Sequence, residues 1–263
     1  MINNFYSENN IKLFNGDCIE VMDLLIANNV KIDGVLTSPP YNIIRPNQDD
    51  RGYDVYNDGM SNEEYISWCC EIFKRFDKLL KKDTCVLWNM SYGSENTEAM
   101  PLTISKIITD TNYTLADIIV WKKKTATPNA MSKNKRTRIV EFIYVFVRKD
   151  EFLTFNTNKK IKSYRKTGQP NYENVYNFIE AKNNDGSCEL NKATYSSDLC
   201  NQLLDFYYKE NDLILDCFNG TGTTGVSCIN LNMQYIGIEL SDKQFEYSID
   251  RLKNIGGNIN ESY

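Results

Sequence analysis

The segment from Asp212 to Glu239 constrains the fold more strongly than any other part of this chain. It begins with an apolar run, Asp212 to Cys217, which is typical of a buried strand. A glycine-rich turn leads into a helical stretch at Val226 to Leu231, and Gln234 to Glu239 predicts a second strand. Two successive strands joined through a helix pair in parallel. The segment therefore predicts an α/β protein.

The same alternation continues along the rest of the chain. Ser61-Asn62-Glu63-Glu64 is a capping box that predicts a helix start, because serine and glutamate can each bond the other's backbone N–H. Apolar periodicity predicts further strands at 11–15, 31–36, 84–89, 115–121 and 139–147, and helices at 18–28, 61–80, 102–109, 197–207 and 241–253. We therefore predict a doubly wound, mostly parallel sheet.

Composition excludes several classes of protein. The chain has 263 residues, with 41% hydrophobic and 12% aromatic residues, which are globular values. No apolar run has membrane-spanning length, and Met1 to Asn4 lacks the features of a signal peptide, so we expect a cytoplasmic protein. The chain contains no histidine, which excludes a histidine general base. Its eight cysteines form no C-x-x-C pair, so we expect reduced core cysteines and no metal.

Charge is distributed unevenly. The net charge of −5 does not indicate a protein that coats duplex DNA. Lysine and arginine nevertheless cluster in two segments, Lys122 to Arg138 and Lys159 to Lys166. An acidic protein with such local patches can bind a polyanion, whereas on charge alone a solvated surface is an equal alternative.

The glycine-rich turn indicates the ligand. Its glycines follow the pattern G-x-G-x-x-G, and Glu239 lies where an acid can accept from two ribose hydroxyls. A nicotinamide enzyme starts its glycines at the strand end, but here Asp216 to Asn219 intervenes. An acid beside the ligand suits a cation better than a pyrophosphate. The turn therefore favours S-adenosylmethionine (AdoMet), which carries a sulfonium and an ammonium group and no phosphate.

A second motif, Thr37-Ser38-Pro39-Pro40-Tyr41-Asn42, follows the predicted strand 31–36. Open α/β sheets place their chemistry at such strand ends. The two prolines fix φ and remove two backbone donors, and Ser38 is held extended by the proline after it. The resulting stiff turn offers a hydroxyl, carbonyl groups and an aromatic ring, which suit a flat ring bearing an amino group. By itself the motif also fits an ordinary proline-rich turn.

Together, T-S-P-P-Y, D-x-F-x-G-T-G-T-T and I-G-I-E resemble the DNA amino-methyltransferases over nearly the whole chain. The catalytic motif precedes the AdoMet motif, as in the beta class of that family. The resemblance implies a Rossmann-like methyltransferase domain with a small target-recognition insertion. It divides the chain into a catalytic half (1–149), the insertion (150–189) and an AdoMet-binding half (190–263).

The resemblance also assigns site residues. Gly16-Asp17 matches a turn near the AdoMet adenine, and Asn191 to Tyr195 matches a segment bordering the methionine carboxylate, with Asn191 where the family often has histidine. The implied catalytic residues are Ser38, Pro39, Pro40 and Tyr41. The implied AdoMet contacts are Asp17, Cys18, Thr37, Ala193, Thr194, Asp216, Phe218, Gly220, Gly222, Thr223, Thr224 and Glu239.

The lone pair of an exocyclic amine is delocalised into the ring. If Ser38 Oγ and the Pro39 carbonyl accept the amine hydrogens, the lone pair can point at the AdoMet methyl without a covalent enzyme intermediate. Tyr41 would stack on the target base after it flips out of the duplex. Serine in this motif is commoner among the family's cytosine-N4 enzymes, which slightly favours cytosine N4 over adenine N6. Methylation at C5 needs a Pro-Cys dipeptide, which the chain lacks.

Double-stranded DNA is the expected partner. We expect phosphate contacts from the insertion 150–189 and from the segment Lys122 to Arg138, which we call the basic loop. In the basic loop the expected contacts are Lys123, Lys133, Arg136 and Arg138. A homodimer and a cognate restriction endonuclease are further partners that the sequence leaves open. Two other functions also stay open, namely methylation of an RNA or protein amine, and non-catalytic binding of AdoMet and nucleic acid.

Overall fold

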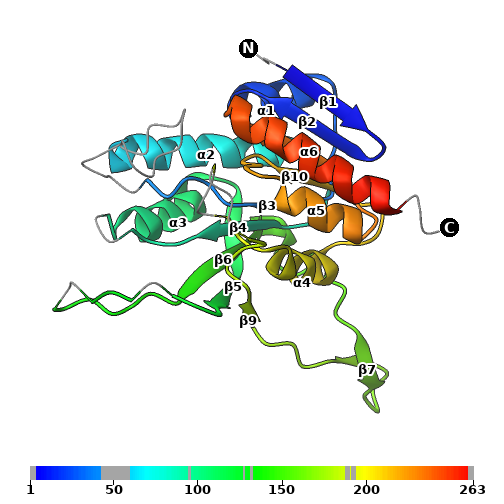
Figure 1. Cartoon of the computed structure of the whole chain (residues 1–263). Helices are drawn as coiled ribbons and strands as arrows, with labels where there is room; N and C mark the ends of the chain where they lie inside the picture. The colour runs from blue at the N-terminus through cyan, green and yellow to red at the C-terminus, as the bar shows by residue number, and fades with distance from the viewer. Residues whose placement is uncertain are drawn as a thin grey trace.

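The computed structural model describes residues 4–42, 60–93, 96–126, 128–130, 133–186, 190 and 194–259. Within them, one sheet of nine strands forms the centre of the molecule (Figure 1). Its strands, in spatial order, are β1 (Asn4–Glu8), β2 (Ile11–Asn15), β11 (Gln234–Glu239), β10 (Leu213–Asp216), β3 (Gly34–Thr37), β4 (Val86–Met90), β6 (Val140–Arg148), β5 (Tyr113–Lys123) and β9 (Phe178–Ala181).

The strands from β2 to β4 run parallel to one another, and β6 runs antiparallel to both of its neighbours, β4 and β5. The prediction of a mostly parallel α/β sheet is therefore confirmed. Strand β1 pairs antiparallel with β2 and was not predicted, because its residues are mostly exposed and carry no apolar alternation. We call the edge of the sheet at the carboxyl ends of β3 and β10 the carboxyl edge, and the opposite edge the amino edge.

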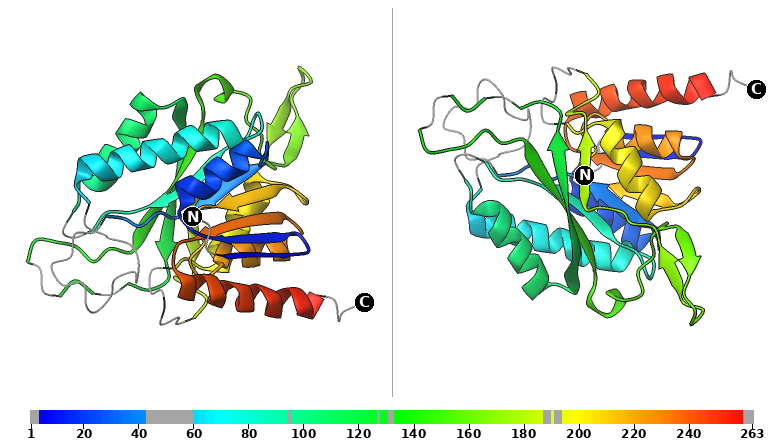
Figure 2. Two further views of the ribbon diagram at one scale, coloured as in Figure 1. Left: turned by 90° about the horizontal axis from the view of Figure 1, so that it is seen from above. Right: turned by 90° about the horizontal axis from the view of Figure 1, so that it is seen from below.

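Helices cover both faces of the sheet (Figure 2). One face packs on α1 (Cys18–Ala27), α2 (Asn62–Leu79) and α3 (Ala99–Asp110), and the other on α4 (Ser197–Tyr207), α5 (Thr223–Asn230) and α6 (Asp242–Ile259). The predicted capping box starts α2, since Ser61 Oγ accepts from Glu64 N and the Glu64 carboxylate accepts from Ser61 N. Burial of one apolar face per helix produces a three-layer sandwich.

The direction of the chain reverses between β10 and β3. From β10 the chain passes through α5 to β11 on one side, whereas from β3 it passes through α2 to β4 on the other. The loops after β10 and β3 therefore diverge at the carboxyl edge, and open α/β sheets usually bind their ligand in a crevice at this position. Both sequence motifs lie in these two loops.

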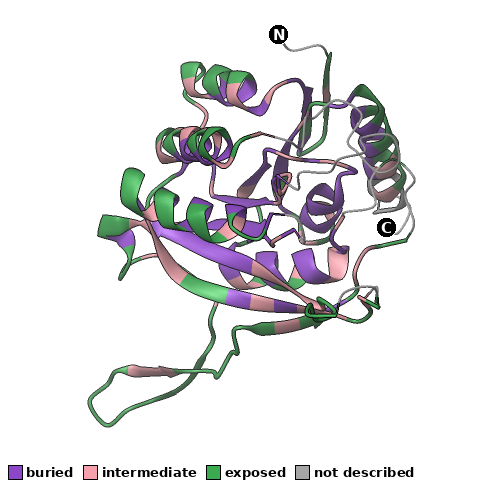
Figure 3. Ribbon diagram, turned by 90° about the vertical axis from the view of Figure 1, so that its left-hand side faces the viewer, coloured by how far each residue is buried: buried purple, intermediate pink, exposed green. Residues whose placement is uncertain are grey.

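The insertion 150–189 does not form a separate unit. It contains the antiparallel pair β7 (Ile161–Tyr164) and β8 (Pro170–Tyr172), and its last strand, β9, joins the main sheet beside β5. Figures 1 and 2 show β7 on the opposite side of the molecule from the basic loop. Most residues of β7 and β8 are exposed (Figure 3).

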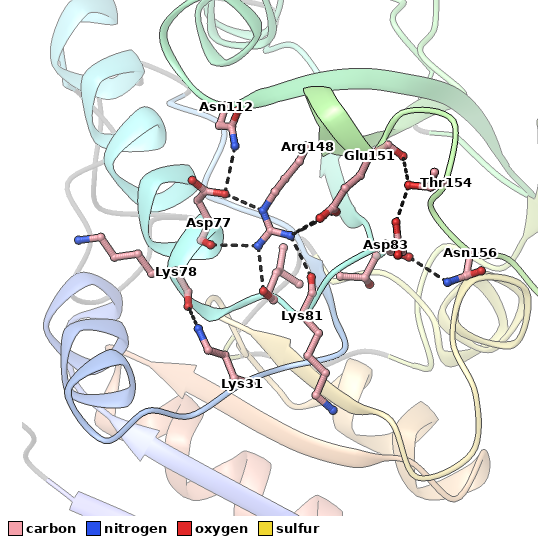
Figure 4. Close-up of polar contacts among 12 residues, drawn as sticks. Lys31, Asp77, Lys78, Lys81, Asp83, Asn112, Arg148, Glu151, Thr154 and Asn156 are labelled. Carbon is pink, nitrogen blue, oxygen red and sulfur yellow. Dashed lines mark hydrogen bonds and ion pairs between the residues drawn. The ribbon is translucent and has the colours of Figure 1, made fainter.

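Arg148 fixes the start of the insertion at the amino edge (Figure 4). Its guanidinium donates to Asp77 at 2.6 Å, to the Leu80 carbonyl at 2.8 Å and to Glu151 at 3.1 Å. Asn158 N then donates to the Phe206 carbonyl at the end of α4, at 2.7 Å. These bonds explain why β7 and β8 extend from the amino edge.

The seven described cysteines are free and buried, as predicted, and Cys188 lies outside the described residues. Burial raises the pKa of the Cys18, Cys69 and Cys85 thiols, which keeps them protonated and unreactive. A search of the described helices finds none with the length and apolar character needed to cross a membrane.

Candidate active site at the sheet switch point

The two sequence motifs lie side by side. Strands β3 and β10 pair in parallel, with Val35 opposite Leu215. At the strand ends, Thr37 Oγ1 donates a 2.6 Å hydrogen bond to Asp216 Oδ1. The residue before Ser38 is thus bonded directly to the first residue of the glycine-rich turn. This contact places the two predicted half-sites on the same crevice.

Asp216 organises the glycine-rich turn. Asp216 is 1% exposed. Its carboxylate accepts hydrogen bonds from Thr37, from Thr224 Oγ1 at 2.6 Å, from the Tyr195 hydroxyl at 3.1 Å and from Phe218 N at 3.0 Å. Burial raises the pKa of Asp216, and these hydrogen bonds oppose that shift.

Asp216, Thr37 and Thr224 are buried, and both threonine hydroxyls donate to the Asp216 carboxylate, so these side chains build the turn. Their contact with AdoMet stays a prediction. Tyr195 belongs to the same cluster, at 2.6 Å from Thr224 Oγ1, and was not among the predicted site residues. The segment Asn191 to Tyr195 was matched to the border of the methionine carboxylate, but that match did not indicate that Tyr195 bonds Asp216 and Thr224.

The glycines of this turn have two different roles. Gly220 and Gly222 have φ of +52° and +80°, in the left-handed region that favours glycine. At Gly225 a Cβ atom would lie 2.8 Å from the Tyr235 ring, so this glycine allows α5 to pack closely on β11. The first two glycines therefore shape the turn that faces the crevice, and the third supports it from behind.

Glu239 and the Gly16-Asp17 turn lie together beside this loop. Glu239 accepts from Gly220 N at 2.7 Å and from Ser241 N at 2.8 Å, while its carbonyl accepts from Gly16 N at 2.9 Å. Burial raises the pKa of Glu239 to about 7, despite the lowering effect of these backbone bonds. Asp17 caps α1 by accepting from Ile19 N at 2.9 Å. A half-buried acid that holds a glycine loop fits the ribose side of a nucleoside.

The other predicted AdoMet residues are more varied. Cys18 is buried in the core, and Phe218 packs on Trp68 and Trp88, with ring centroids 5.4 and 6.2 Å apart. Thr223 Oγ1 accepts from Arg251 at 3.0 Å, and Arg251 also donates to the Thr221 carbonyl. Thr194 is half-buried, and Ala193 lies outside the described residues. Arg251, which braces the turn from α6, was missed by the sequence prediction.

The proline turn is held rigidly from below. The Tyr65 hydroxyl of α2 donates to the Pro40 carbonyl at 2.7 Å. Asn42, which has φ of +52°, donates through Nδ2 to the Met60 carbonyl at 2.9 Å. Asn42 and Met60 border the segment 43–59, which lies outside the described residues. Ser38 stays half-buried, with its hydroxyl towards Tyr41.

The Tyr41 hydroxyl is the centre of a second polar cluster. It lies 3.3 Å from Ser38 Oγ and donates towards Asn89 Oδ1 and Glu141 Oε2, each at 3.1 Å. Glu141 also pairs with Lys123. Asn89 is the last residue but one of β4 and Glu141 is the second residue of the antiparallel β6, so both lie at the carboxyl edge. Neither was predicted, although Glu141 is a solitary carboxylate in an apolar strand.

Two of the four predicted DNA contacts are engaged within the protein. Lys123 pairs with Glu141 and lies over the Trp121 ring, 5.1 Å from its centroid. Lys123 is thereby linked through Glu141 to Tyr41 of the proline turn, and its contact with DNA phosphate stays a prediction. Arg138 donates to the Tyr92 carbonyl and stacks on the Tyr92 ring. Lys133 and Arg136 are exposed.

The family model described as DNA methylase (N6_N4_Mtase) matches residues 32–250. The chain belongs to this family. Its members are AdoMet-dependent DNA amino-methyltransferases, and the predicted family, fold class and methyl donor are thereby confirmed. The glycine-rich turn, Glu239 and the turn at Gly16-Asp17, as described above, fit AdoMet. Among the described residues, no group of three or more histidine, cysteine, aspartate or glutamate side chains gathers to hold a metal ion.

Curated relatives include the type II methyltransferase M.BglII of Bacillus subtilis, 27% identical over 87% of this chain. The chain spans 65% of that protein's length, which is less than two thirds. The DNA adenine methyltransferase YhdJ of Escherichia coli is 23% identical over 91% of the chain and 82% of its own length.

Two solved structures show the same fold. The PvuII DNA methyltransferase (cytosine-N4-specific) superposes with a TM-score of 0.72, at 16% identity over 100% of this chain and 98% of that one. The M1.HpyAVI–SAM complex superposes with a TM-score of 0.62, at 21% identity over 92% of this chain and 99% of that one.

Proposed function

We propose that this methyltransferase transfers the AdoMet methyl group to N4 of cytosine in double-stranded DNA. The 2.6 Å bond between Thr37 and Asp216 carries the proposal, because it puts the Ser38 turn against the turn suited to AdoMet. Both turns lie at the switch point of the sheet, where a nucleoside and a flipped base can meet.

Each group has a defined task. AdoMet supplies an electrophilic methyl group when it is bound by the glycine-rich turn, Glu239 and the turn at Asp17. Ser38 Oγ and the Pro39 carbonyl accept the hydrogens of the target amine. The Tyr65 hydroxyl occupies the Pro40 carbonyl, so Pro39 is the better candidate of the two prolines. The half-buried Tyr41 ring offers its open part to the flipped base.

The base is the finer part of the proposal. Ser38 favours cytosine N4, through the resemblance described above, and the PvuII enzyme of the same fold is named cytosine-N4-specific. Adenine N6 is the second candidate, because the relative YhdJ is named a DNA adenine methyltransferase. Both amines lie beside a ring nitrogen acceptor, so the chemistry of the turn serves either base.

The biological context follows from the relatives' names. M.BglII is named a type II methyltransferase, which supports a site-specific modification enzyme working beside a restriction endonuclease. The homodimer and the direct endonuclease partner stay predictions. Target recognition by the insertion 150–189 also stays a prediction. The end of the insertion returns to the carboxyl edge, where Asn183 bonds the Thr125 carbonyl at 2.9 Å.

Nucleoside mass spectrometry of host DNA tests the proposal directly. Cells expressing the wild-type chain should contain N4-methylcytosine, and cells expressing Ser38→Ala should not. N6-methyladenine in the wild-type sample would select the second candidate. If neither base appears, and purified protein transfers labelled methyl to RNA or protein but not to DNA, the proposed substrate is wrong.

A further inference from the structure

Methylation of an amine leaves a proton that must depart. The acceptor side chain in the motif is a serine, which is neutral, and the chain has no histidine to serve as a base. A base near the target amine must therefore be sought among carboxylates. Glu141 is a carboxylate joined to Ser38 by hydrogen bonds, through the Tyr41 hydroxyl.

The direction of these bonds can be deduced. Asn89 Nδ2 donates to the Phe142 carbonyl at 3.1 Å, which orients Oδ1 towards Tyr41. The Tyr41 hydroxyl thus faces two acceptors, Asn89 Oδ1 and Glu141 Oε2, and has one hydrogen to give. In the contact with Ser38 it must accept, so Ser38 donates and its Oγ lone pairs are available to the target amine.

Lys123 completes the arrangement. It pairs with Glu141 Oε1, whereas Tyr41 approaches Oε2, so the ion pair and the hydrogen bond use different oxygens. The Glu141 side chain is 16% exposed and the Lys123 side chain 25% exposed, so both retain access to solvent. Between the two oxygens, Oε2 is the better proton acceptor, and a proton placed there can pass on to water.

We propose that Glu141 is the terminal acceptor of the proton released by the target amine, reached through Ser38 and Tyr41. This inference rests on the proposed function. As the new N–C bond forms and the S–C bond of AdoMet breaks, the sulfonium becomes a neutral thioether. One amine proton moves to Ser38 Oγ, the Ser38 proton moves to Tyr41 Oη, and the Tyr41 proton moves to Glu141 Oε2. The carboxylate becomes a carboxylic acid, so atoms and charge balance.

The test measures the single-turnover rate of methyl transfer to DNA with AdoMet saturating. Glu141→Gln keeps the shape and an acceptor oxygen but removes the base, so the rate should fall about 10²-fold. Glu71→Gln is the matched control, because Glu71 also pairs with a lysine, Lys74, on the exposed surface of α2. It should keep the wild-type rate.

Chemical rescue separates proton acceptance from mere positioning. Glu141→Ala should lose activity to a similar degree and recover at least tenfold with added formate, whereas chloride at equal ionic strength should restore nothing. Unrescued loss, or no loss in Glu141→Gln, would overturn the relay.

Tyr41→Phe keeps the ring and breaks the chain of hydroxyls, so it tests the relay even if the Glu141 variants fold poorly. It should be as slow as Glu141→Gln, and the double variant no slower than either. A wild-type rate in Tyr41→Phe would overturn the relay. Failure of the wild-type protein to methylate DNA would instead refute the proposed function.

Discussion

The two turns at the switch point are each organised by a carboxylate, but the carboxylates differ in environment. Asp216 is 1% exposed and accepts from four donors, all within the chain. The Glu141 side chain is 16% exposed, forms an ion pair with Lys123 and accepts a hydrogen bond from Tyr41. The comparison indicates that a buried carboxylate with a full set of hydrogen-bond donors acts as a structural support. A carboxylate near solvent with fewer donors keeps lone pairs that can take part in chemistry.

The largest expected effect is on stability. Asp216→Ala leaves the donors of Thr37, Thr224 and Tyr195 without their acceptor, and an unsatisfied buried donor costs about 1–3 kcal/mol. Unfolding in urea should show a loss of about 3–5 kcal/mol. Glu141→Ala, which breaks a partly exposed pair, should lose about 1 kcal/mol. If both variants lose the same free energy of unfolding, the difference in environment between the two carboxylates does not determine their contribution to stability.

A change in the proline turn should alter the rate of methyl transfer and leave the stability of the protein unchanged. Ser38→Ala removes an acceptor needed in the transition state, so methyl transfer should slow by about 10²–10³-fold. AdoMet affinity, measured by calorimetry, and the melting temperature should stay at wild-type values. Ser163→Ala, on exposed β7, is the control and should change none of them. Loss of AdoMet binding in Ser38→Ala would place Ser38 on the donor side of the crevice.

Glu239 predicts a pH dependence confined to the AdoMet side. Its pKa is about 7 in the folded protein and 4.5 without the fold, so the folded state holds the extra proton between these values. Stability of the free protein should therefore fall as pH rises from about 4.5 to 7, by about 3 kcal/mol at most. The ionised form accepts ribose hydroxyls better, so AdoMet affinity should rise up to about tenfold from pH 6 to 8.

Glu239→Gln should flatten both curves. Calorimetric titration with AdoMet at several pH values measures the affinity, and urea unfolding in the same buffers measures the stability. An equally steep affinity curve in Glu239→Gln would assign the titration to another group.

The sequence predicted the pairing of the two turns because both motifs follow buried strands of a parallel sheet, whose carboxyl ends share one edge. It did not reveal Asn89, Glu141 or Tyr195. Glu141 lies 100 residues from Tyr41, and its place at the carboxyl edge depends on the antiparallel direction of β6. Local patterns predict which residues form a strand, but the partner of a polar side chain is set by the register of the assembled sheet.

Composition also failed to distinguish the two basic segments, which lie at opposite edges of the sheet. The loop after β5 starts at the carboxyl edge beside Ser38, whereas β7 and β8 extend from the amino edge. This separation favours the loop after β5 for phosphate contacts, and contact between the insertion and DNA stays a prediction.

The smallest expected effect distinguishes these two segments. Lys133 and Arg136 are exposed, whereas Lys123 and Arg138 are occupied by Glu141 and Tyr92, so the first pair is the better choice for phosphate contacts. Replacing both with glutamine should reduce the slope of log affinity against log salt by about 2, measured by fluorescence anisotropy with duplex DNA. The matched change at Lys162 and Lys166 on the β7–β8 hairpin should leave the slope unchanged. A reduced slope for the hairpin variant would mean that bound DNA reaches the amino edge, which requires a bent duplex or a second binding site.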